Sequence, residues 1–258
     1  MTAKRVQARV FGEVADAYDR VRPAYPDALV DDVLAYAGLG GAPAVEAGAG
    51  TGKATAMFAA RGTDLTAVEP DAAMAAVLNR RLGGHSNVSV VVSPFEEFRP
   101  DRAFGLLFSA QAWHWTDPEV RWRKAAEVLA PEGALALFWH LDMLKDPAVL
   151  DAALAVHRAR APHILLDTEL PTESSIESSR WWLELERQDT FHDLSARLYP
   201  SELTFPIADY LTLLGTRSAI RMLPEDVRAG LLAALRDVLG DQVTLSVTTA
   251  LYLARRTP

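Results

Sequence analysis

The chain has 258 residues, half of them hydrophobic, a formal net charge of −8 and no cysteine. This is the composition of a globular protein with a large core, and its acidic charge argues against a nucleic-acid partner, which needs a basic surface. The missing cysteines exclude disulfides, thiolate metal sites and cysteine nucleophiles, and the sequence has no signal-peptide or membrane-spanning pattern, so we expect a cytoplasmic protein with no membrane partner.

Two helices are expected before the first strand. An amphipathic pattern predicts one helix over residues 9–20, and a second is predicted over residues 27–37. The segment Arg22–Pro26 separates them, because its two prolines restrict the backbone. Glycines at positions 38, 40 and 41 then end the second helix.

Short apolar runs alternate with helical patterns between residues 44 and 140. The expected strands are residues 44–47, 65–68, 88–92, 104–109 and 134–139, and the expected helices are residues 53–61, 71–82 and 117–129. Such alternation predicts a mostly parallel sheet with helices on both faces. Right-handed crossovers make it a doubly wound, Rossmann-like sheet.

The pattern changes after residue 140. A helix is expected over residues 146–160, irregular chain over 161–190, helices over 207–214 and 225–239, and strands over 191–199 and 244–254. The last segment alternates in polarity and resembles a final hairpin strand. The fold class is therefore α/β, with a mostly parallel seven-stranded sheet whose last strand is antiparallel.

A glycine loop, Glu46-Ala47-Gly48-Ala49-Gly50-Thr51-Gly52, follows the first of these strands and precedes a helix. Gly48 and Gly50 have no Cβ atom, so the backbone can turn tightly and approach a ligand. In a doubly wound sheet such a ligand lies beyond the carboxyl ends of the strands. By itself the loop could also be an ordinary tight turn.

An acidic residue, Glu69, ends the next strand, where it can accept hydrogen bonds from the ribose hydroxyls of a nucleoside. Nicotinamide dinucleotides and S-adenosylmethionine both use this arrangement. Glu46 favours the second, because a carboxylate before the first glycine suits an ammonium group and repels a pyrophosphate. The loop also reads E-x-G-x-G-x-G, whereas dinucleotide binding usually needs G-x-G-x-x-G.

Six pieces in order give a more specific signal than the loop alone. They are YDRVRPAYP (18–26), VEAGAGTG (45–52), AVEPDAAM (67–74), VVVSPFEEF (90–98), SAQAWHWTDP (109–118) and ALALFWH (134–140). With them, the segment from Phe11 to His140 resembles the class I S-adenosylmethionine-dependent methyltransferases. It is most similar to their small-molecule group, related to trans-aconitate and ubiquinone-type methyltransferases. The C-terminal third matches only in general layout.

The resemblance implies a cofactor site for S-adenosyl-L-methionine. Glu46, Gly48, Ala49 and Gly50 would hold its methionine end and Glu69 its ribose. The adenine would lie near Pro70, Met74 and Phe95, although Pro94 stands where many relatives have an aspartate, and Glu96 could replace that residue. The other implied cofactor contacts are Tyr18, Arg22, Ser109 and Ala110.

The resemblance also implies which residues face the methyl acceptor. Gln111 would line the gap between the sulfonium and the acceptor, and His114 could act as a general base, although a histidine between two tryptophans can equally be a packing element. Residues implied in acceptor binding are Tyr25, Trp115, Trp139, His140 and Trp181.

The family layout suggests four segments. These are an N-terminal helical lid (1–40), the cofactor-binding core (41–140), an inserted cap for the acceptor (141–190) and the C-terminal part of the core sheet (191–258). We expect no metal, because His157 and His163 have no acidic partners at ligand spacing and are expected at the surface. The basic run Arg121–Lys124 is expected to be a solvated helix face.

The sequence therefore predicts a methyltransferase (EC 2.1.1.-) that acts on a small-molecule metabolite as a monomer or homodimer. Three alternatives stay open at this stage. One is a nicotinamide-dependent oxidoreductase, another is a non-catalytic cofactor-binding or regulatory protein, and the third is an enzyme that uses S-adenosylmethionine without transferring its methyl group. The identity of the acceptor and of the methylated atom stays open.

Overall fold

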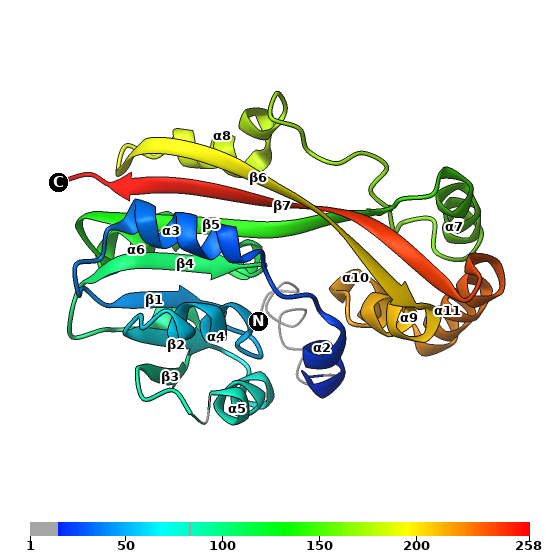
Figure 1. Cartoon of the computed structure of the whole chain (residues 1–258), viewed down its shortest axis with the longest axis horizontal. Coiled ribbons are helices and arrows are strands. Elements are labelled where there is room, and N and C mark those ends of the chain that lie inside the picture. The colour runs from blue at the N-terminus through cyan, green and yellow to red at the C-terminus, as the bar shows by residue number, and fades with distance from the viewer. Residues whose placement is uncertain (1–14, 83) are drawn as a thin grey trace. The chain divides into compact units, whose positions relative to one another are not determined.

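The structure, a computed structural model, describes residues 15–82 and 84–258. It divides the chain into two compact units. Of the described residues, the first unit, called here the core unit, comprises 24–139, 172–199 and 249–258, and the second, the helical unit, comprises 15–23, 140–171 and 200–248. Three long strands contribute residues to both units (Figure 1).

The described residues form one seven-stranded sheet in the order β3-β2-β1-β4-β5-β7-β6. The strands β1 to β4 are Ala44–Ala47, Leu65–Glu69, Val88–Val92 and Phe104–Ala110, and the strands β5 to β7 are Leu129–Leu144, Phe191–Pro206 and Gln242–Arg256. Strands β1 to β5 pair in parallel, and β7 runs against its neighbours (Figure 1). The predicted α/β class and antiparallel last strand are confirmed.

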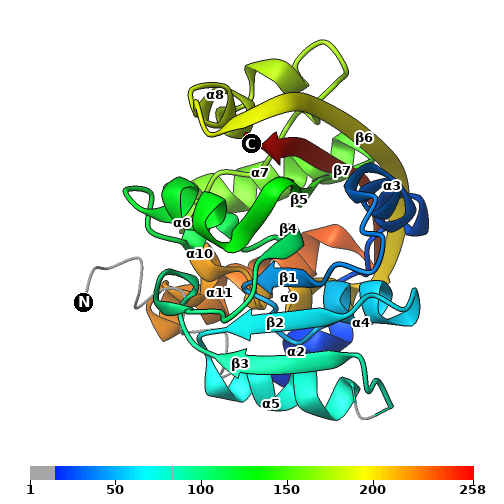
Figure 2. The same ribbon diagram turned by 90° about the vertical axis from the view of Figure 1, so that its left-hand side faces the viewer.

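The sheet changes direction at β1, which has β2 on one side and β4 on the other. The chain winds outward from β1 to β2 and β3, and then crosses back to β4 (Figure 2). Doubly wound sheets bind ligands at such a point, beyond the carboxyl ends of the strands. The glycine loop follows β1, so the fold places it at this switch point.

The central strands are apolar because helices of the core unit cover the sheet. Every residue of β1 and β2 is buried. The ring of Phe108 on β4 stacks on Phe58 at 4.1 Å and on Phe138 at 6.3 Å between centroids. The helices of this unit are α3 (Asp27–Ala37), α4 (Lys53–Ala60), α5 (Ala72–Arg81), α6 (Arg121–Val128) and α8 (Arg180–Glu186).

The helical unit has a separate hydrophobic core. Helix α11 (Glu225–Leu239) packs against α7 (Pro147–Arg160) and α9 (Ile207–Gly215), and α2 (Ala15–Val21) packs against α9. Leucines of α9 and α11, such as Leu214, Leu231 and Leu235, are buried in this core. A short helix, α10 (Ser218–Arg221), connects α9 and α11.

Several predicted boundaries are wrong. Strand β5 runs from Leu129, although Pro131-Glu132-Gly133 resembles a turn, because the strand absorbs these residues as an irregularity in its pairing with β4. Strands β6 and β7 are also longer than predicted, since their pairing continues beyond the local alternation. Helix α6 begins at Arg121 rather than at residue 117.

The segment 161–190, predicted to be irregular, contains α8 and a 3₁₀ turn over Ile176–Ser178. Ser179 caps α8, because its hydroxyl accepts the N–H of Trp182 at 3.3 Å. The predicted first helix is described only from Ala15, and its earlier residues, with Phe11, lie outside the described chain. The division into lid, core and cap by function stays a prediction.

Candidate functional site

The glycine loop adopts a backbone that favours glycine. Gly48, Gly50 and Gly52 have φ values of 74°, 58° and 83°, which side-chain-bearing residues rarely adopt. The amides of Gly48 and Ala49 both donate to the carbonyl of Val68, at 2.8 and 3.1 Å. A Cβ on Gly48 would lie 2.4 Å from the Cβ of Ala112. The loop therefore needs glycine at position 48 because the segment after β4 presses against it.

The side chain of Glu69, at the end of β2, stabilises this loop through a hydrogen bond. Its side chain is buried, one carboxylate oxygen accepts the N–H of Gly50 at 2.7 Å, and the other accepts the N–H of Asp71 at 2.8 Å. Burial raises the pKa of the Glu69 carboxyl to about 7, although these two hydrogen bonds oppose the shift. Glu69 thus joins the ends of β1 and β2 through a carboxyl group held at the switch point.

Glu46, the last residue but one of β1, is a second buried carboxyl group. It is 1% exposed, and it accepts a hydrogen bond from the hydroxyl of Thr55 at 2.5 Å. Burial, with repulsion from Glu69, raises the pKa of Glu46 to about 8. Neither carboxylate forms a salt bridge within residues 15–82 and 84–258. Two buried acids without a cation form a site that a positively charged ligand would complete.

The predicted adenine side contains two buried apolar residues. Met74 lies in the first turn of α5, whose N-cap Asp71 accepts the amides of residues 73 and 74. Phe95 packs against Trp113 with ring centroids 5.7 Å apart. One oxygen of Glu96 accepts the N–H of Asp117 at 2.6 Å. These residues follow β2 and β3, beside the loop, and their contact with an adenine stays a prediction, as does that of Pro70 and Pro94.

The segment after β4 is tied to both neighbouring strands. The hydroxyl of Ser109 donates to the carbonyl of Ala47 at 2.8 Å, and the amide of Gln111 donates to the carbonyl of Phe138 at 2.9 Å. Gln111 has a φ of 59°. A left-handed conformation at a residue other than glycine stores strain, which is typical of functional sites. Ala110 ends β4 directly before it.

His114 forms a hydrogen bond that determines which ring nitrogen carries its proton. The indole N–H of Trp139 donates to Nδ1 of His114 at 3.2 Å. Since Nδ1 accepts, the neutral ring carries its proton on Nε2, an assignment made from this hydrogen bond. Trp115 packs against the same imidazole at 4.6 Å between centroids.

Trp139 also brings together two predicted acceptor-site residues. Its ring stacks on Trp181 of α8, with centroids 4.6 Å apart and planes 5° apart. Tyr252 of β7 meets the Trp139 ring at its edge. The structure thus joins His114, Trp139 and Trp181, which are far apart in the sequence, in a single aromatic cluster of the core unit.

Other predicted site residues have different surroundings. Tyr25 packs edge-on against Phe138 at 4.8 Å and belongs to the hydrophobic core of the sheet. Tyr18, Arg22 and His140 belong to the helical unit. There the guanidinium of Arg22 lies 4.9 Å from the Tyr18 ring and donates to the hydroxyl of Thr216 at 3.0 Å. Their predicted roles in binding stay predictions.

The basic run on α6 is expected in solvent, and this expectation is wrong for Arg121 and Lys124, whereas Arg123 is exposed. Arg121 is 1% exposed, forms an ion pair with Glu184 of α8, and lies 5.2 Å from the ring of Trp181. Lys124 is also buried and donates to the carbonyl of Phe98. Glu184 could not be predicted as the partner of Arg121, because it lies 63 residues away in the chain.

Thr55 is a second residue that the sequence analysis missed. Its position could have indicated the contact with Glu46. Thr55 lies in the first turn of the helix after the glycine loop, where a hydroxyl faces back toward the strand that carries Glu46. His157, expected at the surface, is instead buried on α7.

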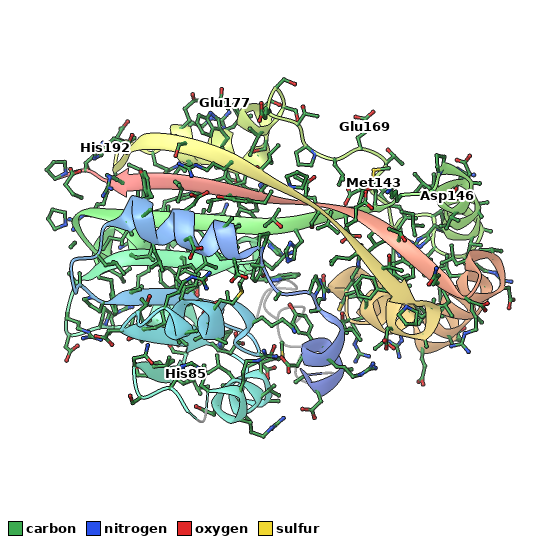
Figure 3. All side chains as sticks on the ribbon, viewed as in Figure 1. His85, Met143, Asp146, Glu169, Glu177 and His192 are labelled. Atoms are coloured by element: carbon green, nitrogen blue, oxygen red, sulfur yellow. The ribbon has the colours of Figure 1, made fainter. Side chains whose placement is uncertain are left out.

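Among the residues that the structure describes, no three His, Asp or Glu side chains lie close enough together to hold a metal ion. His85 and His192, for example, lie near opposite edges of the sheet (Figure 3). None of the described helices combines the length and hydropathy needed to cross a lipid bilayer.

Known proteins are similar to this chain in the part that contains the glycine loop and Glu69. Residues 45–137 match a family model described as a methyltransferase domain. An uncharacterized methyltransferase of Mycobacterium tuberculosis is 36% identical over 138 residues, which cover 54% of this chain and 55% of that protein. The chain thus spans about half the length of the curated relatives that it matches first.

Solved structures extend the similarity to the fold. A structure from Anaeromyxobacter dehalogenans, described as a type II methyltransferase, covers 92% of this chain and 99% of its own, with a TM-score of 0.62 and 28% identity. The phosphoethanolamine N-methyltransferase 2 of Haemonchus contortus, solved with S-adenosyl-L-methionine, has a TM-score of 0.56 at 14% identity and covers all of this chain and 60% of its own. This second likeness shows the fold alone.

Proposed function

We propose that this chain, which belongs by sequence and fold to the class I S-adenosylmethionine-dependent methyltransferases, transfers a methyl group from S-adenosylmethionine to a small-molecule metabolite. One observation carries the proposal: two buried carboxyl groups, Glu46 and Glu69, lie on either side of the glycine loop without a cationic partner in the described chain. The loop between them lets a ligand approach the backbone closely.

The residues present fit S-adenosylmethionine. Its methionine ammonium would pair with Glu46, whose raised pKa reflects burial without a counter-ion. Its ribose hydroxyls would donate to Glu69. Each oxygen of Glu69 already accepts a backbone N–H, but an ionised carboxylate offers about four lone-pair sites, so both oxygens can accept a further hydrogen bond. A pyrophosphate would meet two acids here, which argues against a nicotinamide dinucleotide.

S-adenosylmethionine supplies an already activated methyl group, so the protein has mainly to align the acceptor and exclude water. Strained Gln111 and the aromatic cluster of His114, Trp139 and Trp181 are the residues proposed for this alignment. Because Trp139 occupies Nδ1, His114 presents an N–H on Nε2. That proton suits the orientation of an acceptor oxygen, and general-base action at Nδ1 would require Trp139 to move away.

The acidic net charge of −8 supports a small acceptor rather than a nucleic acid. We also propose a cytoplasmic location and a monomer or homodimer. A panel of metabolites, each assayed for release of S-adenosylhomocysteine, would identify the acceptor.

Isothermal titration of the full chain tests the proposed cofactor. We expect binding of S-adenosylmethionine and S-adenosylhomocysteine and no binding of NADH at equal concentration. Preferential binding of NADH would overturn the proposal. Binding of S-adenosylmethionine without product release from any metabolite would favour a non-methylating or regulatory role.

A further inference from the structure

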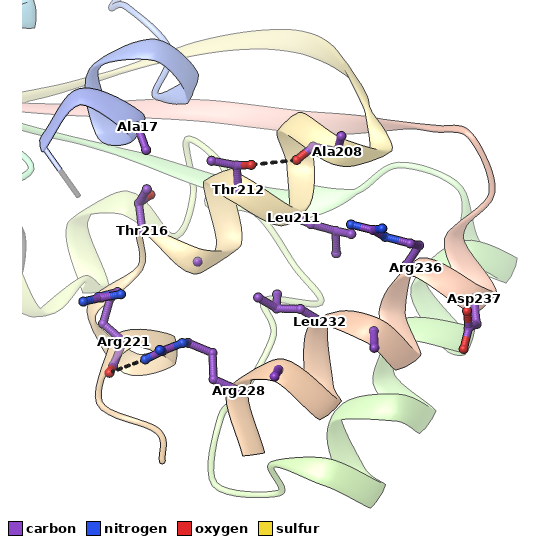
Figure 4. A pocket seen from close by; sticks show the side chains of 13 residues that line it. Ala17, Ala208, Leu211, Thr212, Thr216, Arg221, Arg228, Leu232, Arg236 and Asp237 are labelled. Carbon is purple, nitrogen blue, oxygen red and sulfur yellow. Dashed lines mark hydrogen bonds between the residues drawn. The ribbon is translucent and has the colours of Figure 1, made fainter. Parts of the chain in front are cut away.

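A groove lies between α9 and α11 of the helical unit (Figure 4). It is open to solvent and has a volume of about 530 Å³, which is within the range of small-molecule sites. All of its lining residues belong to the helical unit. None of them is among the residues that form the glycine loop or the aromatic cluster, so the groove is a separate feature of the molecule.

Small residues leave this groove open. Gly215 of α9 and Ala229 and Ala233 of α11 line it, while Leu211 and Leu232 give it an apolar floor. A Cβ added to Gly215 would only just reach Leu232, at 4.0 Å. The two helices thus face each other with a gap that small side chains cannot fill, and the gap is lined by hydrocarbon.

Two arginines flank the apolar floor along α11. Arg228, Leu232 and Arg236 follow one another at intervals of four residues, so they lie on one helix face, with the two arginine backbones about 12 Å apart. Figure 4 shows both guanidinium groups beside the groove. Arg228 makes one long hydrogen bond, to the carbonyl of Arg221 at 3.4 Å, and neither arginine forms a salt bridge with another described residue.

The charge at the groove differs in sign from that of the chain. Arg221, Arg228 and Arg236 line it with a single acid, Asp237, although the whole chain carries a net charge of −8. A local positive charge over an apolar floor is complementary to a molecule with an anionic head and a hydrocarbon body.

We propose that this groove binds an amphiphilic carboxylate, a single acid group on an unbranched hydrocarbon chain of medium length. The hydrocarbon would lie against Leu211 and Leu232, and the carboxylate would pair with Arg228 or Arg236, whose guanidinium groups can hold it with two hydrogen bonds. The volume of the groove suits one such molecule rather than a protein segment.

Isothermal titration with decanoate, on the full chain with and without S-adenosylhomocysteine, tests the proposal. We expect saturable binding of decanoate under both conditions, and at least about tenfold weaker binding of decanol and decyltrimethylammonium, which lack the anionic head. Equal binding of all three would show a merely apolar surface and overturn the proposal, as would binding only to vesicles of an anionic phospholipid. Because the cofactor titration is separate, either proposal can fail while the other stands.

Substitutions locate the site. The double variant R228Q/R236Q should weaken decanoate binding at least about tenfold, whereas R158Q/R160Q removes two exposed charges from α7 of the same unit and should bind like the parent chain. Ala229→Leu should fill the groove and abolish binding. Ala229 is exposed, so the fold should tolerate leucine there. If that variant fails to fold, the double variant R228Q/R236Q still tests whether decanoate binds in the groove. Decanoate binding unchanged in R228Q/R236Q would overturn the proposal.

Discussion

The carboxylate of Glu69 accepts the backbone N–H of Gly50 at 2.7 Å. This hydrogen bond joins the end of β2 to the loop that follows β1, across the point where the sheet changes direction. One side chain therefore both fixes the glycine loop and, in the proposed function, holds the ribose.

Glu69→Ala should weaken binding of S-adenosylhomocysteine by more than about tenfold, because it removes both the ribose acceptor and the loop fastening. Glu69→Gln keeps one acceptor oxygen and should have an intermediate effect. Isothermal titration measures both. Glu97→Ala, on an exposed acid nearby, serves as the control, and an affinity unchanged in Glu69→Ala would remove Glu69 from the site.

Gly48→Ala should lower the free energy of unfolding by about 1–3 kcal/mol or more, because the new methyl group would lie 2.4 Å from the Cβ of Ala112. Gly62→Ala is a matched control, since Gly62 also has a positive φ, 80°, but an added Cβ there meets nothing within 4 Å. Urea unfolding of both variants measures the difference. Equal losses of stability would mean that the contact with Ala112 is relieved without cost.

Stability of the ligand-free protein should fall as pH rises through the range in which Glu46 titrates. The folded-state pKa of Glu46 is about 8, above its ordinary value of 4.5. Between these two pH values the folded chain keeps a proton on Glu46 that the unfolded chain has lost. The stabilisation of the folded state by this proton is therefore complete below pH 4.5 and is lost as the pH rises past 8.

The size of this effect is measurable by urea unfolding at several pH values. One proton of difference corresponds to at most about 1.4 kcal/mol per pH unit. Glu46→Gln, which cannot ionise, should flatten the dependence relative to the parent chain. Identical slopes in the two proteins would show that Glu46 ionises normally.

The affinity for S-adenosylhomocysteine should increase between pH 6 and about 8, by up to about tenfold per pH unit, because its ammonium pairs with Glu46 only after Glu46 loses its proton. 5′-Methylthioadenosine, which lacks the ammonium group, should show no such increase. Titrations of both ligands across this pH range provide the comparison. A parallel increase for both would assign the effect to another group, such as Glu69, whose pKa burial also raises, to about 7.

Trp139→Phe should change the protonation of the His114 ring while leaving the aromatic stack in place. The substitution removes the N–H that donates to Nδ1 at 3.2 Å but keeps a ring against Trp181. Long-range ¹H–¹⁵N spectra report which ring nitrogen carries the proton, so we expect a single Nε2–H form in the parent chain and a mixture in the variant. Trp181→Phe should preserve the parent pattern, and an unchanged tautomer in Trp139→Phe would show that the Trp139 hydrogen bond does not hold it.

The local parts of the site could be predicted from the sequence, because they depend on residues that are adjacent in the chain. Val45–Gly52 is a strand, loop and helix start in consecutive order, and Asp71 caps the helix after Glu69 as predicted. In contrast, the strand predicted over residues 134–139 begins at Leu129, because Leu129 already pairs with Phe104 of β4 before an irregularity in the register.

Contacts between distant residues could not be predicted in this way. Trp181 came from a segment that seemed irregular, and its stacking on Trp139 depends on where the chain returns after the helical unit. The sequence predicts a surface position for Arg121, because the partners that bury it, Glu184 and Trp181, lie about 60 residues away in the chain.

The sequence by itself determined the alternation of strands and helices between residues 44 and 140, the glycine loop and the two acids beside it, because periodicity and short spacing act within a few residues. The tertiary structure alone decided that Glu46 is buried with no cationic partner among the described residues, which nitrogen of His114 carries its proton, and that α9 and α11 leave a groove between them. Burial, tautomer and cavity all depend on atoms brought together from separate segments, and only the packed chain specifies them.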